Sequence, residues 1–138
     1  MTFRSGRPHL GEGSAPGLRV LVIDDDDVAR SVIVDILEQD GHQVTSLPSP
    51  IGATKHIVDQ QVNVVVLDLM MPSMRGDKLA NLLGRNPKLK HLGVVLVTSA
   101  RLEDVSALTD AMASVAIVSK SGLNDELCPA VRRAAKQR

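Results

Sequence analysis

Acidic, hydroxyl and amine side chains stand at or directly after the ends of four apolar runs in this sequence. In chain order these polar residues are Asp24, Asp25, Asp26, Asp27, Asp68, Thr98, Ser99 and Lys120. Each has an ordinary structural explanation when taken alone: Asp27 suits a helix N-cap, Thr98 a turn and Lys120 a solvated surface. A structural scaffold, however, does not require an acid, a hydroxyl and an amine at successive strand ends. The combination therefore indicates chemistry.

The acidic side chains indicate a site for a hard divalent cation. Two carboxylates about 5 Å apart near a protein surface repel each other by roughly 3 kcal/mol at an effective dielectric constant of 20, and three repel more. A cation relieves that repulsion, and an all-oxygen ligand set without His or Cys favours Mg²⁺ over zinc. With a hydroxyl and a lysine added, such a site suits a phosphoryl group, with one carboxylate as nucleophile.

The elements that must position these residues alternate between strands and helices. Four short Val-rich runs are apolar on both faces, as in a covered parallel sheet, and a fifth, more polar run suits an edge. The four runs are 19–23, 63–68, 93–98 and 114–119, and the polar one is 42–47. Helical patterns follow at 27–40, 50–61, 77–84, 102–112 and 124–136. Gly41 is expected to stop the first helix, with Ser49 as N-cap and Pro50 in the first turn of the second.

Five successive strand-helix units predict an α/β fold. Crossover connections are right-handed almost without exception, so these units give an open, doubly wound parallel sheet with helices on both faces. In such sheets ligands bind beyond the carboxyl ends of the strands. The acidic, hydroxyl and amine residues all follow strand ends, so the predicted fold brings them to one edge.

Composition excludes several function classes. The chain has 138 residues, enough for one domain, and with one Phe and no Tyr or Trp its core must be aliphatic. Sixteen basic and sixteen acidic residues cancel, so no overall field attracts nucleic acid or an anionic membrane. No apolar run approaches the roughly 18 residues of a membrane span, and the single Cys128 cannot form an internal disulfide. We therefore expect a cytoplasmic protein, with a disordered tail at 1–17 and one domain at 18–138.

The motifs resemble the receiver domains of two-component response regulators over residues 18–136. "VIDDDDVAR" matches the acidic pair after the first strand, and "VVVLDLMMPSMRG" matches the phosphoacceptor strand and its loop. "VVLVTSA" supplies the hydroxyl, and "VSKSG" supplies the lysine. The resemblance implies a five-stranded, flavodoxin-like sheet in the order 2-1-3-4-5.

The resemblance also implies a role for each site residue. Asp68 would accept the phosphoryl group, and Mg²⁺ would be bound by Asp25, Asp68 and the main-chain carbonyl of Met70, with Asp24 assisting through water. Thr98 and Lys120 would hold the phosphoryl oxygens, and Ser99 would flank the pocket.

The implied function is phosphorelay signalling rather than enzymatic turnover. A histidine kinase or histidine phosphotransfer protein would donate the phosphoryl group and so switch a surface that binds a downstream protein or a fused output domain. Nucleic acid and membrane are not expected partners of this domain. In the pattern of that family, Met70 and Ala100 flank the phosphoryl site. Neither side chain has a group that could orient an attacking water, so the resemblance implies slow autodephosphorylation.

Four positions depart from the usual pattern of that family. Ser121 follows Lys120 where a proline is usual, and Ile117 replaces a frequent aromatic residue. Arg75 stands where an Asp commonly precedes the loop glycine. Pro129 is expected to kink the last helix, with Asn124 as its cap, or to delay its start. None of these changes removes a residue that phosphorylation needs.

Two other interpretations compete with a phosphoacceptor. The DxDxV pattern from Asp24 also resembles the first motif of haloacid-dehalogenase-like phosphohydrolases, with Thr98 and Lys120 in place of later motifs. That family needs acidic metal ligands on a strand after the lysine, and here the only acids that follow, 125–126, are at a helix start. It also leaves Asp68 unexplained. The other alternative is a receiver-like module that binds partners without phosphorylation, which the intact set of chemical residues disfavours.

Overall fold

A computed structural model of the chain describes residues 17–72, 74–99 and 115–136. Within them, five strands form one sheet in which every pairing is parallel: β1 (Arg19–Ile23), β2 (Gln43–Leu47), β3 (Val64–Asp68), β4 (Gly93–Thr98) and β5 (Ala116–Ser119). The strand order is β2-β1-β3-β4-β5. This confirms the doubly wound parallel sheet and places the more polar strand at an edge, as expected.

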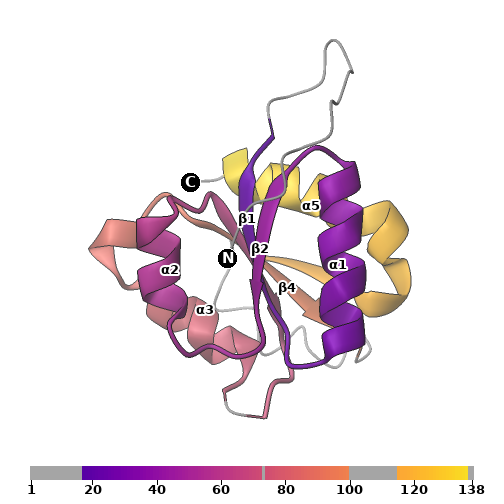
Figure 1. The fold of residues 1–138 in the computed structure, drawn as a ribbon. Coiled ribbons are helices and arrows are strands. Elements are labelled where there is room, and N and C mark those ends of the chain that lie inside the picture. Colours follow the sequence, from indigo (N-terminus) through magenta and orange to yellow (C-terminus); the bar gives the residue numbers. More distant parts are fainter. Residues whose placement is uncertain (1–16, 73, 100–114, 137–138) are drawn as a thin grey trace.

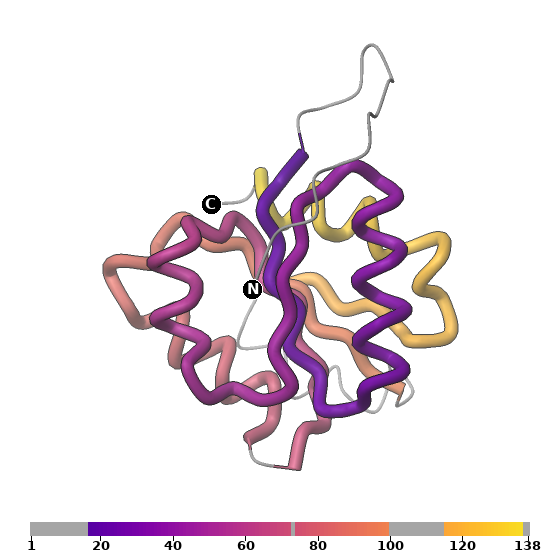
Figure 2. Tube along the Cα trace, viewed as in Figure 1, coloured from indigo at the N-terminus to yellow at the C-terminus, as the bar shows by residue number. Residues whose placement is uncertain are grey.

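The helices cover both faces of this sheet. One face carries α1 (Asp27–Gln39) and α5 (Leu123–Lys136), and the other carries α2 (Ala53–Asp59) and α3 (Gly76–Gly84) (Figure 1). Short 3₁₀ turns, η1 (Pro87–Leu89) and η2 (Lys120–Gly122), complete the described elements. Figure 2 shows the chain changing sides of the sheet between α1 and α2. The helix predicted at 102–112 lies outside the described residues, and no described helix has the length and apolar composition that crossing a bilayer requires.

The core forms two aliphatic layers, one on each side of the sheet. Val20 and Val22 of β1 pack towards α1 and α5, whereas Leu21 and Ile23 pack towards α2 and α3. The largest fully buried side chains among the described residues are all Leu, Ile or Val. Each such side chain contributes about 1.5–3 kcal/mol when fully buried. The predicted aliphatic core is thus confirmed, and it holds the carboxyl ends of the strands at fixed spacing.

The start of α2 differs from the prediction. The helix begins at Ala53 rather than at position 50, because Gly52 has a left-handed backbone (φ 81°) and breaks the helical path before it. The Ser49 hydroxyl accepts a hydrogen bond from the Ile51 N–H (3.3 Å) and so closes a turn instead of capping the helix. Gly41, also left-handed (φ 92°), ends α1 as expected.

The last helix also departs from the prediction. It runs from Leu123 to Lys136 with Pro129 inside it, so the proline does not delay its start. Asn124 is not the cap, because η2 leads directly into the helix and the side chain of Ser119 caps that turn. Apolar residues around the proline, Leu127, Ala130, Val131 and Ala134, are buried against the sheet. Their burial offsets the backbone hydrogen bond that a proline cannot donate.

Gly93 fixes how closely α5 approaches the sheet. A Cβ at this position would lie 2.6 Å from the carbonyl oxygen of Ala134. We expect Gly93→Ala to destabilise the protein by about 1–3 kcal/mol, because the helix must move away from the strand. Gly84→Ala is the matched control, since no atom lies within 4 Å of its added Cβ. Urea unfolding followed by circular dichroism measures both, and equal midpoints for the two variants would contradict the close-packing explanation.

A polar network joins α1, β2 and α5 at the amino edge of the sheet. Asp40 accepts hydrogen bonds from His42 Nε2 (3.0 Å) and from Arg132 (2.5 Å). The other ring nitrogen of His42, Nδ1, accepts from the Leu18 N–H (3.0 Å). Because Nδ1 accepts, the neutral ring carries its proton on Nε2. Cys128 lies beside this network, and burial raises its pKa to about 11, which makes the thiol unreactive.

His42 should make stability depend on pH. Burial lowers the pKa of His42 below 6.5, although the neighbouring Asp40 opposes that shift. The unfolded chain therefore binds the proton more readily, so the full stability present above pH 6.5 is lost as the pH falls below it. Each proton bound only by the unfolded chain costs about 1.4 kcal/mol per pH unit.

The test is His42→Asn, whose side-chain oxygen can still accept the Leu18 N–H. We expect thermal midpoints of this variant to decrease less between about pH 7 and pH 5 than those of the parent, because the titrating group is gone. His91→Asn changes an exposed histidine and is the control substitution. Burial also lowers the pKa of His56, so part of the slope remains. Identical pH profiles of the parent and His42→Asn would refute the assignment.

Candidate functional site

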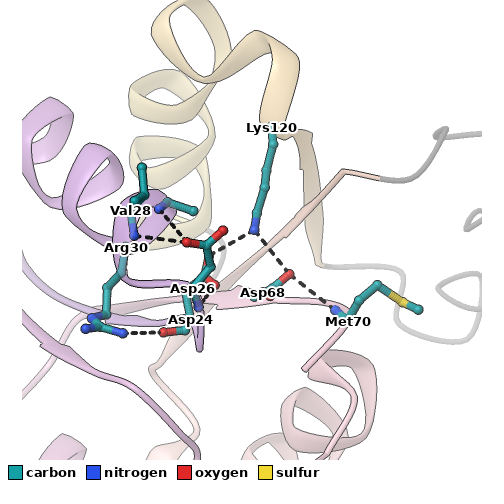
Figure 3. A network of polar contacts seen from close by, with 8 residues as sticks. Asp24, Asp26, Val28, Arg30, Asp68, Met70 and Lys120 are labelled. Carbon is teal, nitrogen blue, oxygen red and sulfur yellow. Dashed lines mark hydrogen bonds and ion pairs between the residues drawn. The ribbon is translucent and has the colours of Figure 1, made fainter. Parts of the chain in front are cut away.

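The parallel sheet brings the predicted site residues to its carboxyl edge. Asp24 follows β1, Asp68 and Thr98 end β3 and β4, and Lys120 follows β5. The register places Asp68 beside Val97, the residue before Thr98. Lys120 extends from the start of η2 towards the two carboxylates, as Figure 3 shows. The sequence-based expectation that these strand ends meet is therefore met.

Three carboxylates form a compact acidic cluster. One ligand oxygen from each of Asp24, Asp25 and Asp68 lies within 4.8 Å of the others. Asp24 and Asp68 are buried, with 0% and 6% of their surface exposed, whereas Asp25 is exposed. The buried Oδ2 of Asp24 lies 3.1 Å from the Lys120 amine, although the geometry between them is poor for a hydrogen bond. An all-oxygen cluster with two buried carboxylates and one exposed carboxylate fits a hard cation that keeps some of its water.

Lys120 partly neutralises this cluster. Its Nζ lies 3.1 Å from Asp24 Oδ2 and 3.7 Å from Asp68 Oδ1. Burial opposes the positive charge of the lysine, but the contact with Asp24 and the charge of Asp68 outweigh burial and raise the pKa of Lys120. One cation facing three carboxylates leaves a net negative charge at the site. That excess charge is what a divalent ion would balance.

Asp68 is an unusually basic carboxylate. Burial and then the negative charge of Asp24 raise its pKa to about 6, and Lys120 and a hydrogen bond from the Met70 N–H (3.3 Å) only partly oppose that shift. The group is still mostly ionised at pH 7. Higher basicity makes its oxygen a better nucleophile than an ordinary aspartate.

The four consecutive aspartates have four different environments. Asp24 is buried and its Oδ1 accepts the Asp26 N–H (2.9 Å). The N-cap of α1 is Asp26, whose side chain accepts from the N–H groups of Val28 and Ala29, and not Asp27 as its position suggests. Asp25 is the exposed member of the cluster. The run of like charge is therefore explained by one cap, one surface ion pair and two site carboxylates.

Arg30 holds this acidic loop in place, a contact that sequence reasoning did not find. Its guanidinium donates to the main-chain carbonyl of Asp24 (2.8 Å), as Figure 3 shows. It also donates to the carboxylate of Asp27 (2.5 Å). The side chain is only 19% exposed. The spacing of Asp27 and Arg30, three residues apart, indicates their ion pair, but nothing in it indicates the bond to a carbonyl.

The loop after β3 packs tightly under Asp68. A Cβ on Gly76 would lie 2.5 Å from the main-chain oxygen of Asp68, so only glycine fits there without a shift. Arg75, the unusual residue before it, forms a two-pronged ion pair with Asp77 (3.0 and 2.8 Å) at the start of α3. Its charge is thus used within the loop. The Met70 side chain, two residues after Asp68, is 55% exposed.

The remaining predicted residues flank the cluster. Thr98 is fully buried at the end of β4, and Ser99 after it is exposed. Ile117 of β5 is partly buried and packs on the α2 and α3 side of the sheet. Ala100 and the predicted helix after it lie outside the described residues. Thr98 and Asp68 end neighbouring strands, because β4 pairs directly with β3.

Comparison with known proteins decides the family. The response regulator receiver domain profile matches residues 20–132. The chain belongs to the response regulator receiver domains. Such receivers act in phosphorelay signalling, and this membership disfavours the phosphohydrolase interpretation. Receivers of this family bind Mg²⁺ at an acidic pocket and take phosphate from histidine kinases, and the acidic cluster described above occupies the corresponding edge of this receiver.

Several relatives and solved structures resemble this receiver. Protein PilG of Pseudomonas aeruginosa is 30% identical over 88 residues, which cover 64% of this chain and 65% of PilG. The 3',5'-cyclic-nucleotide phosphodiesterase regA of Dictyostelium discoideum is 31% identical over 67% of this chain but only 12% of its own length. The crystal structure of response regulator TrrA from Thermotoga maritima, in complex with Mg(2+)-BeF, is 25% identical with a TM-score of 0.74, over 85% of this chain and 98% of that one. The receiver thus spans only part of these curated relatives.

Proposed function

We propose that Asp68 accepts the phosphoryl group and that Asp24, Asp25, Asp68 and the main-chain carbonyl of Met70 hold Mg²⁺. The observation that carries this proposal is the position of Asp68. It lies at the end of the central strand β3, within 4.8 Å of two further carboxylates and 3.7 Å from the Lys120 amine. When bound, Mg²⁺ supplies positive charge that neutralises the carboxylates and the phosphoryl oxygens.

In the proposed transfer, an oxygen of the Asp68 carboxylate attacks the phosphorus atom of a donor phosphohistidine. The new O–P bond forms as the P–N bond breaks, and the imidazole keeps the electron pair and takes up a proton. Lys120 and the Thr98 hydroxyl then hold the phosphoryl oxygens. The lysine amine, which contacted the Asp68 carboxylate before the transfer, now contacts these oxygens. The high basicity of Asp68 supports its role as nucleophile.

A histidine kinase or a histidine phosphotransfer protein is the proposed donor. It must approach Asp68 from the open carboxyl edge, where the side chains of Val28 and Met70 are 73% and 55% exposed on either side of the cluster (Figure 3). Donor proteins of this kind obtain their phosphoryl group from ATP, which supports the cytoplasm as the compartment of this receiver. The output is proposed to be a downstream protein partner or a fused output domain.

Acetyl phosphate separates the competing functions. With Mg²⁺ present, we expect the intact mass to increase by one phosphoryl group, because the small donor needs no docking surface, and we expect the adduct to persist for minutes. Continuous release of phosphate without an adduct would favour a phosphohydrolase. An unchanged mass, with donor intact, would favour a module that binds partners without phosphorylation. The same incubation without Mg²⁺ is the control.

A further inference from the structure

Lys120 reaches the acidic cluster from a very short element. It is the first residue of η2, a single 3₁₀ turn between β5 and α5. Its Nζ contacts Asp24 (3.1 Å) and Asp68 (3.7 Å), and only 20% of the side chain is exposed. A lysine side chain is long and flexible and loses much rotamer freedom when it is held in one place. Its backbone must therefore be fixed accurately.

Two serine hydroxyls fix that backbone. Ser119 Oγ accepts a hydrogen bond from the Ser121 N–H (3.2 Å) and caps the turn. The hydroxyls of Ser119 and Ser121 also hydrogen-bond each other (2.8 Å). Among the described residues every peptide bond is trans, so the linkage from Lys120 to Ser121 is an ordinary one. The three residues form a clasp, Ser119–Ser121, with the lysine at its centre.

We propose that Ser119 is a positioning residue for Lys120, acting through the clasp. Its hydroxyl holds the turn in the orientation that directs the amine at Asp24 and Asp68. Without that hydroxyl the Ser121 N–H has no side-chain acceptor within the turn, and the turn can unwind towards solvent. The effect of this positioning on phosphorylation rests on the proposed function. The hydrogen bonds of the clasp and the ion pairs of Lys120 do not depend on that function.

A zero-length carbodiimide cross-link tests the clasp without any phosphorylation. The carbodiimide converts a carboxylate to an O-acylisourea, and a lysine amine in contact with it attacks the acyl carbon. The amide forms as a urea leaves, and this urea carries the elements of the one water that the protein loses. Tandem mass spectrometry then counts amides between Lys120 and either Asp24 or Asp68. The exposed pair of Lys55 and Asp59 (2.6 Å) on α2 gives an internal standard in the same molecule.

We expect Ser119→Ala to lower the ratio of the Lys120 cross-link to the standard by about fivefold, the population change that corresponds to one hydrogen bond of ordinary net strength. Ser119→Thr keeps the hydroxyl and should restore the ratio. An unchanged ratio in Ser119→Ala would overturn the proposal. If circular dichroism shows that Ser119→Ala does not fold, Ser121→Ala takes its place. It removes the partner hydroxyl and keeps the N–H, so a smaller loss is expected, and an unchanged ratio again overturns the proposal.

A double-mutant cycle then tests the role in phosphorylation. Initial rates with acetyl phosphate are compared for the parent, Ser119→Ala, Lys120→Ala and the double variant. Ser119→Ala should slow the reaction only when Lys120 is present. Equal slowing in both backgrounds would show a general structural effect and overturn the positioning role. If the parent is not phosphorylated, the proposed function fails, and the cross-link still decides whether Ser119 positions the lysine.

Discussion

We expect that replacing Asp68 by Asn abolishes phosphorylation by acetyl phosphate and leaves the fold intact. The amide has the shape of the carboxylate but lacks its nucleophilic oxygen. We expect no detectable adduct by intact mass, against one phosphoryl group on the parent. Asp59→Asn is the matched control, because Asp59 contacts Lys55 on the exposed side of α2, and its rate should equal that of the parent.

The same variant should also be more stable than the parent in the absence of Mg²⁺. The pKa of Asp68 is raised to about 6 by burial and by Asp24, so the ionised carboxylate is less favourable in the folded chain than in the unfolded one. That cost is present above pH 6 and absent below pH 3.8, and a neutral amide removes it. For the phosphorylation of the parent, tandem mass spectrometry that located the phosphoryl group on another residue would overturn the assignment of Asp68 as the phosphoacceptor.

We expect millimolar Mg²⁺ to stabilise the parent by about 1.4 kcal/mol when the ion is at ten times its dissociation constant. We expect this gain because the three carboxylates lie close enough to share an ion only in the folded chain. Asp25→Asn should lose most of the gain. Asp25 is exposed, so this variant removes a ligand without leaving a buried polar group unpaired.

Circular dichroism must report these midpoints, because the chain has no Trp or Tyr. Sodium chloride at equal ionic strength controls for screening of the acidic cluster. Asp59→Asn should keep the full response to Mg²⁺, since it lies outside the cluster. A thermal midpoint of the parent that does not change with Mg²⁺ would refute the metal site.

The position of the site followed from the sequence because two rules act together. Valine-rich runs locate the strands, and the carboxyl ends of parallel strands share an edge, so Asp24, Asp68, Thr98 and Lys120 had to meet. The strand order itself came from family resemblance, since periodicity does not say which strands are neighbours. The structure confirms that order.

Details that depend on side-chain reach were not predictable in the same way. Asp26 and Asp27 are chemically identical candidates for a helix cap, and only the backbone geometry at position 26 decides between them. The left-handed backbone of Gly52 delays the start of α2. This delay could not be predicted, because a glycine adopts helical and left-handed backbones about equally well and the neighbouring residues do not decide between them. The contact of Arg30 with a main-chain carbonyl depends on a folded loop that the sequence does not describe.

The position of α5 has a consequence for how the protein is made. This helix, the last described element, supplies Leu127, Ala130 and Val131 to the layer that covers β1, β3 and β4. Its Arg132 also contacts Asp40, 92 residues earlier in the chain. While the ribosome has released only the first four strands, one face of the sheet is covered by α1 alone and part of its valine surface contacts water. Cooperative folding must therefore wait for α5, and until then the nascent chain exposes apolar surface that favours association with other chains.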